Sequence, residues 1–149
     1  MLDGQEVADR VEISGLLTRY CTAIDSKQFD LLDDVFTEDA LIDYSSSMPD
    51  VRGTRAEMKQ WLSEVLAFFP MTQHLVSNTE FEIDGDRATT RTMFFNPMGW
   101  QDEEGEMQVF FVGGYYNDKL ARTEVGWRIT ERIEHASWTT GTRPGGLPS

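Results

Sequence analysis

Two side chains, Asp25 and His74, are of types that could together transfer a proton. His74 is one of only two histidines and lies in an apolar, strand-like segment, residues 71–78. Imidazole has an unperturbed pKa near neutrality, so a histidine among aliphatic neighbours either has a polar partner or works as an acid or base. Asp25 ends an otherwise apolar helical pattern and is the best candidate for that partner. We therefore predict that the two side chains meet in a pocket, where Asp25 orients the imidazole and raises its basicity.

Both residues also have ordinary structural interpretations. A short polar residue between two helices, such as Asp25, often caps the following helix. A lone histidine in a strand, such as His74, often donates to a backbone carbonyl inside the core. Taken one at a time, each residue fits these interpretations better, and the functional hypothesis depends on the two being in register.

The composition is that of a single domain of 149 residues with a formal net charge of -13. This charge repels phosphate backbones and anionic lipids, which argues against nucleic acid and membrane partners. No apolar run approaches the ~20 residues needed to cross a bilayer, and the first residues do not resemble a signal peptide. Cys21 is the lone cysteine, so there is no internal disulfide and a cytoplasmic location is expected.

Apolar residues at helical spacing predict three helices, over residues 6–24, 28–35 and 55–69. Val7 and Val11 belong to the predicted buried stripe of the first helix. Thr54, followed three residues later by Glu57, predicts a capping box at the start of the third helix.

The second half of the sequence is extended. Strands are predicted over residues 40–44, 72–83, 87–96, 107–120 and 127–138. Asp84-Gly85 predicts a hairpin turn, and residues 97–105 predict a mobile acidic loop. One face of the last strand carries Trp127, Ile129, Ile133 and His135. Glu131 shares that face unless a β-bulge intervenes.

Helices followed by hairpin-linked strands predict an α+β domain, with a cone-shaped, curved antiparallel sheet wrapped around the N-terminal helices. We assign residues 1–138 to this domain and residues 139–149 to a flexible C-terminal tail. Such a cone has an open mouth, which is a default ligand site.

Four segments, residues 23–30, 41–44, 72–74 and 126–129, together resemble the SnoaL-like branch of the nuclear transport factor 2-like superfamily. The similarity is closest to scytalone dehydratase and extends more loosely to hexachlorocyclohexane dehydrochlorinase. The resemblance implies a cone-shaped α+β barrel in which Asp25 hydrogen-bonds His74, the base that takes the substrate proton. It also implies that Tyr44 helps to orient a water molecule bound to the substrate carbonyl.

The sequence also departs from these relatives. Ile24 and Gly114 stand where the dehydratase has a second tyrosine and a second histidine. Tyr20 stands where the dehydrochlorinase has a lysine, and Arg122 aligns only roughly with its arginine. The resemblance therefore implies the Asp25–His74 pair that abstracts the proton, but it does not identify the residue that acts as the electrophile towards the substrate.

We predict a cofactor-independent, dehydratase-like lyase with His74 as base and Asp25 as its partner. Tyr44 or Tyr20 would polarise a carbonyl or protonate a leaving oxygen. The substrate would be a small hydrophobic molecule that is cyclic or bears a carbonyl. Candidate substrate-binding residues are Tyr20, Trp61, Phe94, Phe110, Tyr115 and His135, with His135 closer to the rim.

Three further predictions complete the sequence-based picture. No metal-ligand spacing or glycine-rich phosphate loop is present, so neither a metal nor another cofactor is expected. A homo-oligomer is expected, with a trimer preferred over a dimer by analogy with the similar lyases. The alternative functions are a non-catalytic binding protein or accessory subunit, and an isomerase like ketosteroid isomerase, whose aspartate base lies on the sheet.

Overall fold

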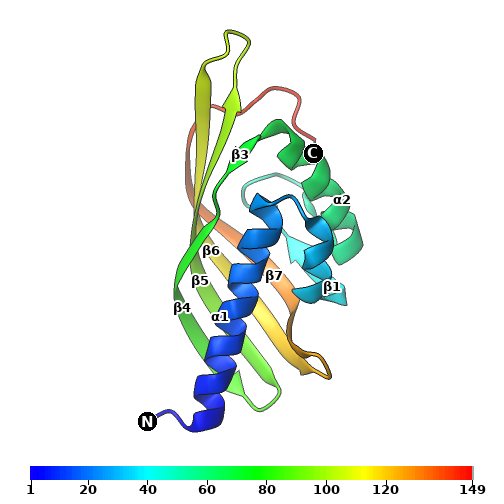
Figure 1. Ribbon diagram of the computed structural model, residues 1–149, viewed down its shortest axis with the longest axis vertical. Coiled ribbons are helices and arrows are strands. Elements are labelled where there is room, and N and C mark those ends of the chain that lie inside the picture. The colour runs from blue at the N-terminus through cyan, green and yellow to red at the C-terminus, as the bar shows by residue number, and fades with distance from the viewer. Residues whose placement is uncertain (149) are drawn as a thin grey trace.

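The computed structural model describes residues 1–148 and consists of a curved sheet with helices packed on its concave side (Figure 1). The elements are α1 (Gly4–Asp25), η1 (Phe29–Asp34), β1 (Phe36–Asp43), β2 (Arg52–Thr54), α2 (Arg55–Val65), η2 (Leu66–Phe68), β3 (Met71–Thr72), β4 (Leu75–Asp84), β5 (Arg87–Gln101), β6 (Met107–Thr123) and β7 (Gly126–Gly141). Both η elements are single stretches of 3-10 helix. The predicted second helix is therefore η1, and the predicted third helix is α2 followed by η2.

The strands form one sheet in the order β2-β1-β7-β6-β5-β3, and β4 also pairs with β5. The predicted α+β class is confirmed, but the sheet is mixed because β1 runs parallel to β7, with Leu41 opposite Glu131. The purely antiparallel prediction is wrong for this pair. The two strands lie far apart in the sequence, so no turn signal could reveal their relative direction.

Helix α1 lies across the concave face of the sheet and begins where Asp3 accepts a hydrogen bond from the Glu6 backbone N–H. The predicted stripe is wrong at its start, because Val7 and Val11 are 47% and 68% exposed. The inward position there is taken by Asp9, which is 3% exposed. A buried carboxylate needs a partner, and periodicity of apolar residues cannot identify such a position.

Asp9 ties the start of α1 to the sheet. Its carboxylate accepts two hydrogen bonds from the Arg122 guanidinium, at 2.9 and 2.8 Å, and one from Trp127 Nε1 at 3.1 Å. The bonds from Arg122 are the main reason that the pKa of Asp9 falls to about 2 from its ordinary value of 3.8. Arg122 thus has a structural partner near the N-terminal end of α1.

We expect this pair to make folding stability depend on pH. Because the pKa of Asp9 is lower in the folded state, the ionised carboxylate stabilises the fold above about pH 4, and this contribution is lost as the pH falls towards 2. Asp9→Asn should lower the free energy of unfolding near pH 6 by about 2–3 kcal/mol and flatten its decline in acid. Urea unfolding over a pH series measures both effects.

Asp86→Asn is the matched control. Asp86 contacts the same guanidinium at 2.9 Å, but its side chain is 80% exposed, so its removal should change stability little. If the free energy of unfolding fell as steeply in acid for Asp9→Asn as for the wild-type protein, ionised Asp9 would not be the source of the pH dependence.

Strands β5 and β6 form a long hairpin, so the predicted loop over residues 97–105 is wrong for residues 97–101, and only residues 102–105 belong to the connection between the strands. β5 continues to Gln101, which pairs with Met107. Pro97 is tolerated inside β5 because its neighbour changes there from β4 to β3, and its carbonyl still accepts from the Gln73 N–H at 3.1 Å. The predicted turn between β4 and β5 is present, with Gly85 at φ 59°.

Strand β7 contains a bulge that changes which residues face the core. The register with β6 shifts between Lys119 and Leu120, whose partners are Glu131 and Ile129. Beyond the bulge, Arg132 and Glu134 are buried, whereas Ile133 is 46% exposed. The predicted inward face is therefore correct at the start of β7 and wrong after the bulge.

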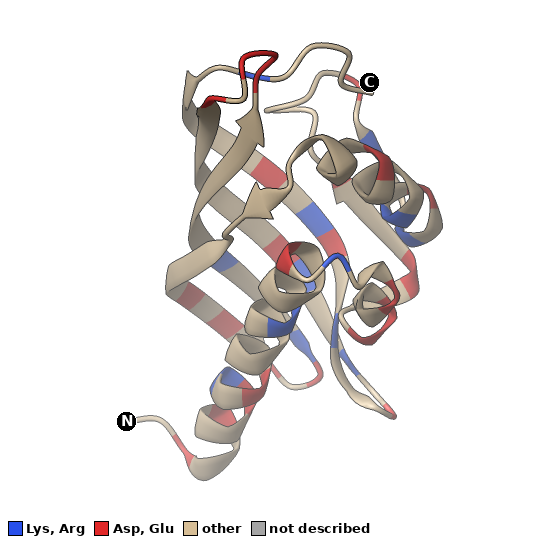
Figure 2. Cartoon of the chain, turned by 45° about the horizontal axis from the view of Figure 1, so that its top comes forward, with Lys and Arg blue, Asp and Glu red and all other residues tan. Residues whose placement is uncertain are grey.

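Helix α2 begins with the predicted capping box: Thr54 accepts from the Glu57 N–H, and the Glu57 carboxylate accepts from the Thr54 N–H. Acidic and basic residues are interspersed along the helices and strands (Figure 2). Over residues 1–148, no helix is both long and apolar enough to cross a membrane.

Candidate active site

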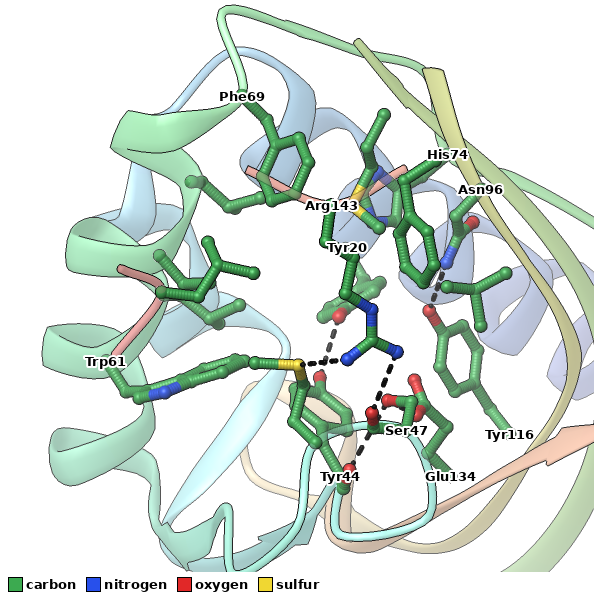
Figure 3. Close-up of a pocket in the computed structure, with 18 residues that line it drawn as sticks. Tyr20, Tyr44, Ser47, Trp61, Phe69, His74, Asn96, Tyr116, Glu134 and Arg143 are labelled. Carbon is green, nitrogen blue, oxygen red and sulfur yellow. Dashed lines mark hydrogen bonds between the residues drawn. The ribbon is translucent and has the colours of Figure 1, made fainter. Parts of the chain in front are cut away.

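A cavity lies between α2 and the sheet, beside the C-terminal end of α1 (Figure 3). One wall is apolar and comes from α2, η2 and the residue after them: Trp61, Leu62, Val65, Leu66 and Phe69. The cavity volume is about 80 Å³, smaller than the roughly 300–1,000 Å³ of typical ligand pockets. Arg143 and Leu147 of the C-terminal segment reach into it and narrow it.

The Asp25 and His74 side chains lie in direct contact, and of the two only His74 lines this cavity. Asp25 Oδ1 is 2.7 Å from His74 Nδ1, and Oδ2 accepts the His74 backbone N–H at 2.8 Å. Thr72 Oγ1 donates to Oδ1 at 3.0 Å. The alternative in which Asp25 caps the next helix is not realised, because no side chain caps η1.

The break between β3 and β4 places His74 at the cavity. Neither His74 nor Gln73 belongs to a strand, so the chain departs from the sheet at this point. The His74 side chain is only 7% exposed and lines the cavity. Because Nδ1 is paired with Asp25, Nε2 is the ring nitrogen that remains for a ligand.

The environment of Asp25 favours its ionised form. Burial raises the pKa of this carboxyl, but hydrogen bonds from the His74 ring, the His74 backbone and Thr72 outweigh burial and hold the pKa below its ordinary value of 3.8. An ionised Asp25 fixes the Nδ1–H tautomer of His74 and stabilises the imidazolium that forms when Nε2 takes a proton.

Two tyrosines form a hydrogen-bonded pair in the same cavity. The hydroxyl oxygens of Tyr20 and Tyr44 are 2.6 Å apart, and both side chains are buried. Burial raises the pKa of both hydroxyls well above 10, so both remain protonated at neutral pH. One of the two hydroxyl hydrogens is used within the pair, which leaves the other to donate to a ligand oxygen.

Of the other predicted substrate-binding residues, Trp61 and Phe110 line the cavity, whereas Phe94, Tyr115 and His135 do not. Phe94 is buried in a stack against Tyr116, 4.3 Å between ring centroids. The bulge in β7 and the alternation of β6 turn His135 and Tyr115 to the outer face of the sheet. There His135 is exposed and Tyr115 packs under Arg91.

The structure adds five polar cavity residues that the sequence analysis did not assign to the site: Ser47, Asn96, Tyr116, Glu134 and Arg143. Asn96 Nδ2 donates to the Tyr116 hydroxyl at 3.0 Å, and Arg143 Nη2 donates to the Ser47 carbonyl at 3.2 Å. Glu134 faces inward because of the β7 bulge, which hydrophobic periodicity did not locate. Arg143 lies in a stretch without periodicity, which the sequence analysis assigned to the tail.

A buried ion pair lies under the tyrosines. Arg132 and Asp118 are fully buried and share two hydrogen bonds, of 2.8 and 2.7 Å. The Arg132 guanidinium carbon lies 4.2 Å from the Tyr20 ring centroid and 4.1 Å from that of Tyr116. Arg132, rather than Arg122, is therefore the arginine of the late strands that lies beside the cavity tyrosines, and its charge favours negative charge developing near them.

Comparisons with known proteins agree with this architecture. An uncharacterized protein of Mycobacterium tuberculosis is 45% identical over 134 residues, which cover 90% of this chain and 89% of that protein. The crystal structure of the Kfla4162 protein from Kribbella flavida superimposes with a TM-score of 0.81 at 29% identity, covering 89% of this chain and 93% of that one.

A protein from Novosphingobium aromaticivorans, provisionally assigned as a scytalone dehydratase, has a TM-score of 0.81 at 21% identity. The match covers 96% of this chain and 97% of that one. This likeness shows a shared fold. The family model described as a SnoaL-like domain matches residues 5–133. The chain therefore belongs to the SnoaL-like domain family.

Proposed function

We propose that the protein is a cofactor-independent, dehydratase-like lyase that removes an α-proton from a small, hydrophobic, cyclic ketone. The observation that carries the proposal is the 2.7 Å contact between Asp25 and His74 at the wall of an apolar cavity. The neighbouring N. aromaticivorans structure assigned as a scytalone dehydratase supports the same reaction class.

In the proposed reaction, His74 Nε2 takes the proton on the carbon next to the carbonyl. Asp25 stabilises the resulting imidazolium, and the free hydroxyl hydrogen of the Tyr20–Tyr44 pair bonds the carbonyl oxygen as it becomes negative. A positioned base contributes roughly 10²–10⁴-fold, which is sufficient for an already acidic proton. Because the cavity is narrow, the C-terminal segment carrying Arg143 moves outward when a ring enters.

The direct experiment is deuterium exchange into α-tetralone, an aromatic cyclic ketone, followed by NMR in D₂O. We expect the wild-type protein to accelerate exchange at the carbon next to the carbonyl well beyond the buffer rate. Exchange at the buffer rate for tetralone and for smaller cyclic ketones would contradict the lyase proposal and favour a non-catalytic binding protein.

We also propose that the protein is a homo-oligomer, with a trimer preferred. Three aromatic side chains, Phe95, Phe111 and Trp138, pack together on the outer side of β5, β6 and β7. Phe95 and Trp138 remain 40% and 48% exposed, which supports burial against another copy of the chain. Light scattering that finds only monomers at tens of micromolar protein would rule this out.

A further inference from the structure

Glu134 is a carboxyl group in the cavity wall that the Asp25–His74 pair does not use. It lies on β7, is 9% exposed, and is the one carboxylic acid among the described residues that line the cavity. Its Oε1 accepts a short hydrogen bond from Ser47 Oγ and a longer one from Ser46 Oγ at 3.4 Å. Figure 3 shows the carboxyl group next to Ser47, apart from His74.

The charges around Glu134 leave it without an ion-pair partner. Arg132 on the same strand is bound to Asp118, and Asp43 of β1 adds a repulsive negative charge. Arg143 lines the same cavity, but its guanidinium bonds the Ser47 carbonyl and packs on the Phe110 ring, and within residues 1–148 it forms no ion pair with Glu134. The carboxyl thus faces an apolar cavity with only serine hydroxyls as direct partners.

This environment suits both protonation states. Burial raises the pKa of Glu134 to about 7, although the hydrogen bonds from Ser47 and Ser46 and the charge of Arg132 each act to lower it. The neighbouring groups Tyr44, which follows β1, and Tyr116, on β6, are neutral hydroxyls at this pH. A group that titrates near the working pH is suited to donate a proton in one step and regain it in another.

We propose that Glu134 is the general acid that protonates the departing oxygen of the substrate. This rests on the proposed function, in which His74 is the base. Glu134 and His74 lie on different walls of one cavity, so a ring that enters as the C-terminal segment moves outward can present its α-hydrogen to one and its hydroxyl to the other (Figure 3).

The chemistry of the step balances without a co-reactant. His74 takes the α-proton, and the electrons of that C–H bond form the new carbon–carbon double bond. The C–O bond breaks, its electrons go to oxygen, and this oxygen takes the proton of the Glu134 carboxyl and leaves as water. The products are the unsaturated ketone and water. A proton then passes from the His74 imidazolium to the Glu134 carboxylate through water, which restores both groups.

The acid determines which reaction the cavity supports. Hydroxide is a poor leaving group, so a base alone would exchange the α-proton but would expel the oxygen slowly. A carboxylic acid next to the departing oxygen converts proton abstraction into dehydration.

The test compares two ketones and two matched variants. Tetralone reports proton abstraction alone, by deuterium exchange. Its β-hydroxy derivative, with the hydroxyl two carbons from the carbonyl, reports loss of water by ultraviolet absorbance. Glu134→Gln keeps the size and the acceptor for the serines but cannot donate an acidic proton. Glu131→Gln is the control, because Glu131 lies on the same strand and binds the exposed Lys119 at 2.8 Å.

We expect Glu134→Gln to slow loss of water from the hydroxyketone about 10²–10⁴-fold more than it slows exchange of tetralone. Glu131→Gln should match wild type in both assays. Unchanged loss of water in Glu134→Gln would overturn the proposal. An equal fall in both assays would also overturn it, because that result describes a damaged cavity rather than a missing acid.

Infrared spectroscopy tests the assignment of Glu134 as the acid independently of the assignment of His74 as the base. If wild type fails to exchange tetralone, the assignment of His74 fails, and Glu134 is then judged by its own titration. The expected result is a protonated carboxyl band at pH 6 that is absent in Glu134→Gln and disappears from wild type above pH 8. A Glu134 carboxyl already ionised at pH 5 would overturn its assignment as the acid.

Discussion

Replacing His74 by alanine is expected to slow α-proton exchange of tetralone by about 10²–10⁴-fold, to near the buffer rate. The reason is that Nε2 of this ring is the group that takes the proton, while Nδ1 is bound to Asp25 at 2.7 Å. The backbone N–H of residue 74 would still donate to Asp25, so we expect the free energy of unfolding to fall by less than about 2 kcal/mol. NMR exchange rates and urea unfolding measure the two quantities.

His135→Ala is the matched control, because it removes the other histidine, which is exposed on the outer face of the sheet. This variant should exchange tetralone as fast as wild type. Added imidazole should partly restore exchange in His74→Ala, since the deletion leaves space beside Asp25 for a free base. Wild-type exchange in His74→Ala would remove this residue from the mechanism.

Replacing Arg132 by methionine is expected to destabilise the protein by about 3–5 kcal/mol, among the largest effects of any single substitution. The substitution leaves the fully buried Asp118 carboxylate without its two hydrogen bonds from the guanidinium. It also removes the cation that packs against the rings of Tyr20 and Tyr116. Urea unfolding near pH 7 measures the loss.

The double variant Arg132→Met/Asp118→Leu separates the ion pair from the packing. Replacing both partners of a buried pair by apolar groups of similar size is often close to neutral, so the double variant should recover most of the stability that the single variant loses. A double variant as unstable as Arg132→Met would show that the aromatic contacts of Arg132, and not its pairing with Asp118, dominate.

Features with a local sequence signal could be predicted. The capping box of Thr54 and Glu57 and the turn at Gly85 both depend on residues a few positions apart, and both are present. The α+β class follows from the order of helical and extended periodicity. Asp25 and His74 could be proposed as partners from their residue types and positions, and the family resemblance added a long-range relation that spacing alone does not contain.

Features set by long-range pairing could not be predicted. The bulge in β7 is visible only in its register with β6, and it decides that Glu134 faces the cavity and His135 faces outward. The burial of Asp9 likewise depends on Arg122, which is distant in the sequence. Hydrophobic periodicity treats both acidic residues as solvent-exposed positions. Asp9 is instead buried against Arg122, and Glu134 is buried in the cavity wall.

The most direct test of the central claim is a long-range ¹⁵N–¹H NMR spectrum of the histidine rings, with and without tetralone. The protein contains two histidines, so His135→Ala leaves only the signals of His74. We predict that the neutral His74 ring carries its proton on Nδ1, hydrogen-bonded to Asp25, and that the unprotonated Nε2 signal shifts when tetralone binds. A neutral ring with its proton on Nε2, or an Nε2 signal unchanged at saturating tetralone, would contradict the assignment of His74 as the base.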